Sequence, residues 1–296
     1  MNDFDQPPQA SLDDTDAGLA VAPALPLPPP DPYASLPPDL RVPWSGIDLA
    51  IFLLIYLGIN FILGLAVFGG AGIVLHKSLT TLQNDSVLFP AIAVIAQVLI
   101  SAATIIYFWI LVRIRRSKSP VQPPEGFWRT MGFRPLAQSG SAATRVLLCL
   151  LGGVVLSIII SVFSSFAGKQ PPTPIDTLFQ SRTAIVLLMG FGILVAPLVE
   201  EMMFRGFLYL VVARRFGMFA GIMFTGILFG LFHALQLWGA WPLIALLMGV
   251  GIAFTWVRAR THSVTASLLM HIAYNSTLFV ALLYQTKGLT DLSHIR

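Results

Sequence analysis

Long apolar runs, separated by short polar, glycine or proline clusters, fill the chain from about residue 46 onward. An α-helix needs about 20 mainly apolar residues to cross the hydrocarbon core of a bilayer, and each run has about that length. The pattern predicts an all-α fold: a polytopic transmembrane helix bundle of about seven spans, or eight if the stretch after residue 285 adds a re-entrant or interfacial segment. The predicted spans are residues 46–68, 88–112, 143–167, 183–213, 217–236, 239–257 and 264–285.

The composition supports a membrane protein. Hydrophobic residues make up 56% of the chain and charged residues only 11%, whereas a soluble domain carries roughly 25% charged residues. The 296 residues leave no room for a large soluble domain beside these spans. The single cysteine, Cys149, lies inside an apolar run and has no second cysteine with which to form a disulfide framework or a thiolate metal cluster.

The first 42 residues have a different composition, rich in proline and aspartate. Such a segment cannot bury a hydrophobic core. We therefore predict a disordered, acidic, Pro-rich tail at residues 1–42, followed by a transmembrane helical domain at residues 43–296. The tail lacks the basic start and short apolar stretch of a signal peptide. A proline-recognising partner is an alternative to a plain solvated leader, and we assign the tail no function.

Basic residues gather in loops between the apolar runs, and the predicted spans place these loops on one side of the membrane. By the positive-inside rule this side is cytoplasmic, as is the N-terminus, and the segments near Lys77, Lys169 and Trp238 lie outside. We interpret the net charge of +4 as a topology signal rather than as a nucleic-acid site. Residues 124–135 are predicted to form an amphipathic interfacial helix. The basic residues are Arg113, Arg115, Arg116, Lys118, Arg129 and Arg134, then Arg214 and Arg215, then Arg258 and Arg260.

Few ionisable residues fall inside the predicted spans, where each costs several kcal/mol unless it is paired or faces a polar cavity. Asp48, Arg145 and Arg258 lie at span ends, where snorkelling to the headgroups accounts for them. Five others lie deeper, in the fourth, fifth and seventh spans. They are Glu200, Glu201, Arg205, His233 and His271.

The spacing of charged residues in the fourth span distinguishes the roles of the two glutamates. Glu201 and Arg205 lie four residues apart, so they can form an ion pair along one helix face. Glu200 points about 100° away from Glu201 and has no partner in its own span. It must find a partner on another helix or take up a proton.

Counting along the helices brings these groups to a similar depth. Glu200 lies about 22 Å before the turn near residues 214–217, and His233 lies about 25 Å after it. His271 and Asn275 lie about 13 Å and 19 Å from the same membrane face, and helix tilt can absorb the difference. The polar groups of three spans can therefore converge at one point within the bilayer.

Two glycines on the fifth span, Gly226 and Gly230, lie on the same helix face as His233. Their spacing forms a small-xxx-small pattern, which lets a neighbouring helix approach closely.

The residues that carry chemistry also form three ordered motifs. Residues 200–205 read Glu-Glu-Met-Met-Phe-Arg, residues 229–233 read Phe-Gly-Leu-Phe-His, and residues 271–275 read His-Ile-Ala-Tyr-Asn. They resemble the EExxxR, FxxxH and HxxxN motifs of the CPBP or Abi family of intramembrane proteases, which is similar to the type II CAAX prenyl endopeptidases. The resemblance covers about residues 183–285, and the first half of the chain matches only as generic spans.

The resemblance implies an endopeptidase that cuts near a membrane-embedded or lipid-modified C-terminus. We expect the protein in a bacterial cytoplasmic membrane. It implies that Glu200 is the general base and that His233 holds or polarises the attacking water. His271 and Asn275 would donate hydrogen bonds to the oxyanion. Glu201 and Arg205 would brace the helix and orient Glu200, with Phe229 as a wall below His233. The implied partners are the lipid bilayer and a peptide or lipidated protein.

The same residues permit a metal site. Glu200, His233 and His271 offer two imidazoles and one carboxylate, a set that binds zinc with a position open for water. These ligands come from three helices rather than from an HExxH pair on one helix, so we expect a mechanism that does not use a bound metal.

Two other functions stay open. A transporter or proton relay also needs intramembrane glutamate and histidine. The polar groups lie in the second half of the chain without counterparts in the first, which argues against a transporter built from inverted repeats. A non-catalytic bacteriocin-immunity or scaffold protein would keep the same residues to hold the bundle together. The sequence predicts neither the substrate nor the oligomeric state.

Overall fold

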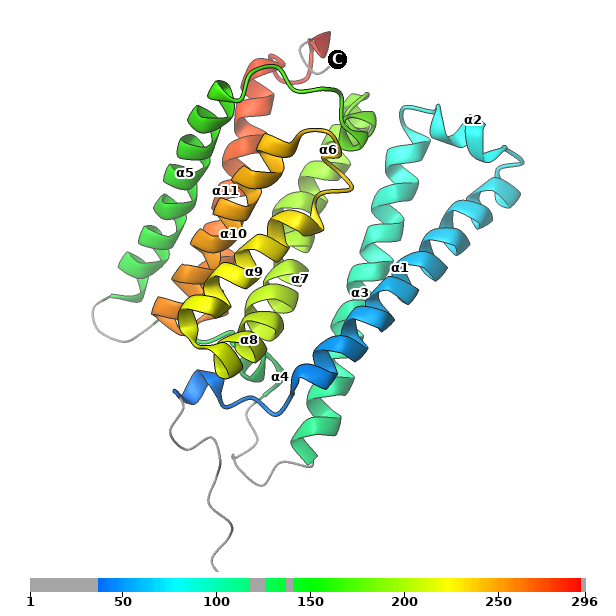
Figure 1. Cartoon of the computed structure of the whole chain (residues 1–296). Helices are drawn as coiled ribbons and strands as arrows, with labels where there is room; N and C mark the ends of the chain where they lie inside the picture. Colours follow the sequence, from blue (N-terminus) through cyan, green and yellow to red (C-terminus); the bar gives the residue numbers. More distant parts are fainter. Residues whose placement is uncertain (1–36, 118–125, 137–140, 294–296) are drawn as a thin grey trace, which may run out of the picture. The chain divides into compact units, whose positions relative to one another are not determined.

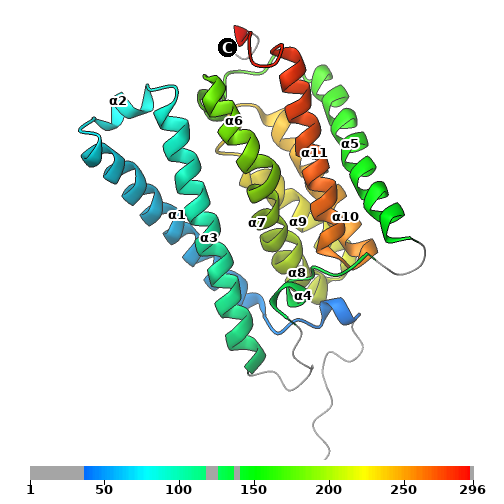
Figure 2. The ribbon, with the colours of Figure 1, turned by 180° about the vertical axis from the view of Figure 1, so that it is seen from behind.

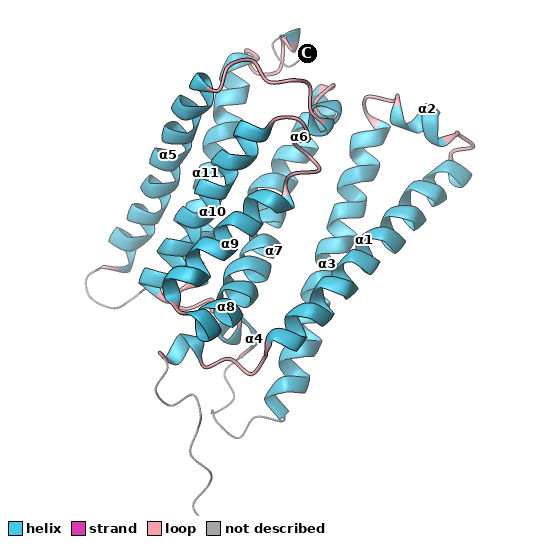
Figure 3. Cartoon of the chain, in the orientation of Figure 1, coloured by secondary structure: helices cyan, strands magenta, loops and turns pink. Residues whose placement is uncertain are grey.

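The computed structural model describes residues 37–117, 126–136 and 141–293, and its regular structure is helical throughout these residues (Figure 3). The predicted tail therefore lies outside the described residues up to position 36.

Six helices are long and apolar enough to cross a membrane within the described ranges. A seventh apolar helix, α9, is shorter. Together they form the predicted polytopic helical bundle, and the chain is an integral membrane protein. The six are α1 (Gly46–Val74), α3 (Leu88–Ser117), α5 (Ala142–Phe166), the continuous helix Arg182–Phe216, α10 (Trp241–Thr261) and α11 (Val264–Gln285), and α9 is Met218–Phe232.

Short elements connect these helices. The turn between α1 and α3 contains α2 (Leu79–Gln83), and the segment before α6 contains the 3-10 helix η2 (Pro174–Leu178). A further 3-10 helix, η1 (Pro38–Leu40), precedes α1. The predicted interfacial helix at residues 124–135 is much shorter in the structure, where α4 covers only Phe127–Thr130. Gly132, with a φ of 87°, ends it, because a left-handed residue cannot continue a right-handed helix.

Two sets of helices lie side by side in Figures 1 and 2. The α1 and α3 hairpin forms one edge, and α9, α10, α11 and α5 form the other part of the bundle. The helix Arg182–Phe216 lies between them and packs against α3, α9 and α11. This central helix carries Glu200, Glu201 and Arg205.

Glycines allow α9 and α10 to approach closely, as their spacing predicts. A Cβ atom on Gly226 would lie 2.5 Å from the backbone nitrogen of Ile252, and one on Gly230 would lie 2.6 Å from that of Met248. Contacts this short leave no room for a side chain. Gly251 on α10 completes the arrangement, because its Cβ would meet the carbonyl oxygen of Gly226 at 2.6 Å.

Helix α9 ends earlier than the sequence pattern predicts. Its 15 residues span about 22 Å, less than the roughly 30 Å of a hydrocarbon core. The predicted span continues to residue 236, but the helix stops at Phe232 and residues 233–239 form turns. His233 is thus the C-cap residue of α9 rather than a residue inside the helix.

Residues 37–45, which we call the N-terminal strap, pack against the ends of several helices. Leu40, Val42 and Trp44 are buried, and the Trp44 ring lies 5.6 Å from that of Phe207. Arg214 on α8 (Tyr209–Phe216) donates hydrogen bonds to the carbonyl oxygens of Val42 and Trp44. Part of the predicted tail, residues 37–42, therefore belongs to the packed region.

Ion pairs at this end of the bundle replace the predicted snorkelling. Arg258 is fully buried, and its Nη1 lies 3.0 Å from Asp39 Oδ2. Asp48 is also buried and pairs with Arg115. The snorkelling interpretation is wrong for these two residues, because each has found a protein partner of opposite charge.

The strap also links the predicted basic clusters. It contacts Arg214 and Arg258 directly, and Asp48, just after it, pairs with Arg115. The three clusters therefore lie at one end of the bundle, as the span order predicts.

Asp39 should contribute substantially to stability. Burial alone would raise the pKa of Asp39, but Arg258 and His262 outweigh it and lower that pKa below its usual value. We expect Asp39→Asn to lower the free energy of unfolding by about 3–5 kcal/mol, since it leaves Arg258 buried and unpaired. Because the folded-state pKa is lowered, the contribution is present near neutral pH and is lost as pH falls through that value.

Thermal unfolding of the purified protein in detergent measures this loss. The double variant Asp39→Asn with Arg258→Met is the control, since it removes the stranded charge and should recover part of the stability. Equal melting temperatures for the wild type and Asp39→Asn would contradict the assigned role.

A second prediction concerns the α9 and α10 contact. Gly226→Ala should destabilise the protein by about 1–3 kcal/mol, because the added methyl group forces the two helices apart. Gly64→Ala on α1 is a matched control, since no atom lies within 4 Å of its Cβ position. If both variants unfold at the same temperature, the close contact is not important for stability.

Candidate active site

The helix that carries the two glutamates is interrupted by two π-helical turns. It runs as α6 (Arg182–Gly190), a first π turn η3 (Phe191–Val195), α7 (Ala196–Met203), a second π turn η4 (Phe204–Leu208) and α8. Pro197 at the start of α7 lacks a backbone N–H and cannot make a regular α-helical bond, which accounts for an irregular turn before it. Such turns often occur at functional sites.

Glu201 and Arg205 form the predicted ion pair. Arg205 Nη1 donates to Glu201 Oε1 at 2.9 Å, and both side chains are fully buried. The pair is therefore removed from solvent screening.

Arg205 also ties this helix to α10. Its Nη2 donates to the carbonyl oxygen of Gly251 at 2.9 Å, and its Nε donates to Thr255 Oγ1 at 3.2 Å. The guanidinium carbon lies 4.6 Å from the ring centroid of Phe229 and 5.3 Å from that of Phe254. Cation–π contacts of this kind add to the hydrogen bonds.

Glu201 ties the same helix to α11. Its Oε2 accepts a hydrogen bond from Ser267 Oγ at 2.6 Å, and its Oε1 lies 3.0 Å from His271 Nδ1. With Arg205 included, three side chains bind this carboxylate. The contacts of Glu201 thus hold the helices together, and its carboxylate oxygens already have protein partners.

Glu200 is surrounded differently. Its Oε1 lies 3.9 Å from His233 Nε2, and its Oε2 lies 3.7 Å from His271 Nε2. Within the described residues its carboxylate makes no direct hydrogen bond, and 17% of its side chain is exposed. The predicted convergence of three helices at Glu200 is present in the structure.

The partners of the two histidines fix which ring nitrogen carries hydrogen. His233 Nδ1 lies 2.9 Å from the carbonyl oxygen of Phe229, and His271 Nδ1 lies 3.0 Å from the Glu201 carboxylate. Both partners can only accept, so each Nδ1 must donate. Each Nε2 is then the nitrogen that faces Glu200.

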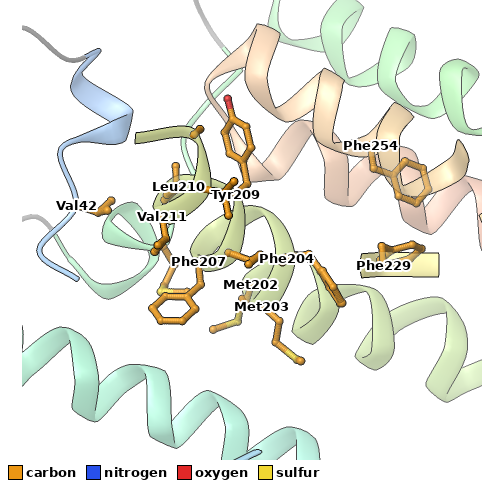
Figure 4. Close-up of a cluster of buried hydrophobic side chains, with 14 of the residues drawn as sticks. Val42, Met202, Met203, Phe204, Phe207, Tyr209, Leu210, Val211, Phe229 and Phe254 are labelled. Carbon is orange, nitrogen blue, oxygen red and sulfur yellow. The ribbon is translucent and has the colours of Figure 1, made fainter. Parts of the chain in front are cut away.

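Aromatic rings enclose this group of polar side chains. The Phe229 ring lies 4.9 Å from that of His233 and 5.8 Å from that of His271, so Phe229 packs against both histidines. The Phe254 ring lies 4.6 Å from His271 at an interplanar angle of 32°. Figure 4 shows Phe229 and Phe254 together with buried side chains of the central helix, including Met202, Phe204 and Phe207.

Asn275 lies one turn after His271 on α11. Its Nδ2 donates to the carbonyl oxygen of Gly192 in the first π turn at 2.7 Å. This bond holds the amide against the central helix and leaves its second amide hydrogen for another acceptor.

Ser267 and Thr255 are members of the site that the sequence interpretation missed. It considered only ionisable residues inside the spans, whereas these two carry hydroxyls. Small polar residues in apolar helices commonly form interhelical hydrogen bonds, and their presence in the sixth and seventh spans was the available signal.

The zinc interpretation has the right ligand types in Glu200, His233 and His271. In the part of the chain that the structure describes, however, no group of three or more His, Cys, Asp or Glu side chains is arranged to hold a metal ion.

Comparison with known proteins supports the resemblance drawn from the motifs. Residues 182–277 match the family model described as type II CAAX prenyl endopeptidase Rce1-like. The matched region begins at α6, ends within α11 and contains all three motifs. No curated protein and no solved structure gives a significant match to the chain.

We expect Glu201→Gln to lower stability by about 3–5 kcal/mol, because Arg205 stays fully buried without its counter-charge. Ser267→Ala is the matched control in the same cluster. It removes one hydrogen bond and should cost about 1–3 kcal/mol. Thermal unfolding in detergent separates the two, and a larger loss for Ser267→Ala would contradict the central role of the ion pair.

Proposed function

Since residues 182–277 match the type II CAAX prenyl endopeptidase family model, we propose that this protein hydrolyses a peptide bond near a membrane-embedded or lipid-modified C-terminus. The observation that carries the proposal is the position of the Glu200 carboxylate between His233 Nε2 and His271 Nε2. Glu201 has three protein partners, whereas Glu200 is free to exchange a proton with a reactant.

The separations around Glu200 fit a bridging water. Distances of 3.7 and 3.9 Å are too long for direct hydrogen bonds, and polar groups beyond about 3.5 Å are commonly joined by water. The neutral His233 Nε2 accepts one hydrogen of that water, and Glu200 accepts the other. This orients the water oxygen toward a substrate carbonyl.

In this proposal His271 donates through both ring nitrogens. Its Nδ1 lies against Glu201, which accepts only, and its Nε2 must donate if it is to stabilise a negatively charged oxygen. Nδ1–H of this imidazolium then donates to Glu201, and Nε2–H points toward Glu200 and the reaction centre.

The reaction proceeds by general base catalysis. Glu200 takes a proton from water as the water oxygen bonds to the scissile carbonyl carbon. The carbonyl π electrons move to its oxygen, and His271 Nε2–H and the second amide hydrogen of Asn275 stabilise that oxyanion. When the carbonyl re-forms, the C–N bond breaks and the amine takes the proton from Glu200, which leaves a carboxylic acid and a free enzyme.

A zinc ion, if bound, would use Glu200, His233 and His271 and would activate water as a Lewis acid. The steps above require no metal, and a chelator distinguishes the two forms of the proposal.

The orientation in the membrane follows from the basic clusters. These lie at the end of the bundle that holds the N-terminal strap. By the positive-inside rule we place this end on the cytoplasmic side of a bacterial cytoplasmic membrane.

The test is cleavage of a library of farnesylated C-terminal peptides by the purified full-length protein in detergent. Glu200→Gln and His233→Ala should each lower the rate by about 100-fold or more, because they remove the base and the water-holding group. Leu54→Ala is the control, since Leu54 is an exposed residue of α1.

The design also separates the alternatives. Activity that survives a strong chelator supports the metal-free reaction, and activity lost to the chelator and restored by zinc supports the zinc form. If the wild-type protein cleaves no member of the library and both substitutions only lower stability, the scaffold interpretation replaces the peptidase.

A further inference from the structure

Tyr56 on helix α1 lies next to the aromatic residues that border the candidate active site. The buried residues of α1 are Asp48 and Phe52, and no described residue of α1 beyond Phe52 is buried. Tyr56, one turn after Phe52, is half-buried.

Polar side chains are rare on this helix. Apart from Asp48 at its first turn, α1 carries only Tyr56 and Asn60. Tyr56 lies ten residues after Gly46, about 15 Å along the helix, which places it near the middle of the hydrocarbon core. A tyrosine is normally enriched at the headgroup level instead. Its depth therefore calls for a polar neighbour inside the protein.

The ring of Tyr56 contacts the aromatic layer next to the catalytic histidine. Its centroid lies 5.9 Å from that of Phe232 on α9. The Phe232 ring in turn lies 5.8 Å from that of His233 and 5.5 Å from that of Phe204. Phe232 thus separates Tyr56 from His233 by one ring.

The hydroxyl of Tyr56 interacts with polar side chains. Its hydroxyl interacts electrostatically with the Glu200 carboxylate, and the Asn60 side chain lies beside it. Asn60 Nδ2 also donates to the backbone carbonyl of Tyr56 at 2.8 Å, which fixes the relative position of the two polar residues.

We infer that Tyr56 is a substrate-positioning residue that binds the peptide from the α1 side of the site. Its hydroxyl donates a hydrogen bond to a backbone carbonyl of a peptide lying between α1 and α9, beside Glu200. The inference rests on the proposed peptidase function. It assigns α1, which lies outside the matched family region of residues 182–277, a direct part in substrate recognition.

Kinetics provide the first test. Tyr56→Phe keeps the ring and removes the hydroxyl, so kcat/KM should fall about 3- to 10-fold, the value of one neutral hydrogen bond. The loss should appear mainly in KM, because the contact is made in both the bound substrate and the transition state. Tyr107→Phe is the matched control. The rings of Tyr56 and Tyr107 both contact that of Phe52, but the electrostatic neighbours of Tyr107 are Asp48 and Arg115.

A crosslinking test does not depend on cleavage. A photoreactive benzoylphenylalanine at position 56 in the Glu200→Gln protein should crosslink a farnesylated peptide. The same group at position 54, an exposed position of α1, should not.

The two tests separate failure of the inference from failure of the function. If the wild type cleaves peptides but Tyr56→Phe retains full kcat/KM and position 56 yields no crosslink, the inference is wrong and the peptidase stands. If the wild type cleaves nothing but position 56 crosslinks the peptide and position 54 does not, Tyr56 binds peptide in a protein that is not a peptidase. If there is neither cleavage nor crosslinking, both proposals fail.

Discussion

The fully buried ion pair of Glu201 and Arg205 organises the second half of the molecule. A charge in a membrane interior is costly unless it is neutralised and hydrogen-bonded, so each donor and acceptor of this pair needs a partner nearby. The partners come from α10 and α11, through Gly251, Thr255, Ser267 and His271. Satisfying one ion pair therefore fixes three helices relative to one another. Glu200 is held in a defined position because it lies next to Glu201 on the same helix, although it makes none of those contacts itself.

Much of this arrangement could be predicted from the sequence because helical spacing in a membrane is restrictive. The separation of four residues predicted the Glu201–Arg205 pair. Residue counts from the turns, together with helix tilt, predicted that Glu200, His233 and His271 could converge. The glycines of α9 predicted the close approach of another helix, and the structure identifies α10 as that helix. Each of these inferences needed only the α-helical rise and the cost of burying charge.

Other features depended on contacts between distant segments, which spacing does not encode. Arg258 looked like a snorkelling residue because its partner Asp39 lies in a segment whose composition predicts disorder. The end of α9 at Phe232 could not be predicted either, because its apolar pattern continues past the helix end. The hydrogen on Nδ1 of each histidine depends on Glu201 or on a backbone carbonyl of α9. Local patterns thus predicted the members of the site, and tertiary contacts determined their chemical states.

The two π turns on either side of α7 determine where a residue could be deleted from the central helix. A π turn closes its hydrogen bond one residue later than an α turn, so it holds an additional residue, and each residue turns an α-helix by about 100°. Deleting one residue from Phe191–Val195 would therefore allow a regular α-helix to form with α6 in nearly its present rotation relative to Glu200. Deleting one residue from the regular α-helical stretch at residues 196–199 instead would rotate α6 by about 100°, and the face of α6 that buries Ala184 and Ile185 would turn away from its neighbours. The length of the central helix is thus coupled to its two irregular turns, even though neither turn contributes a reacting side chain.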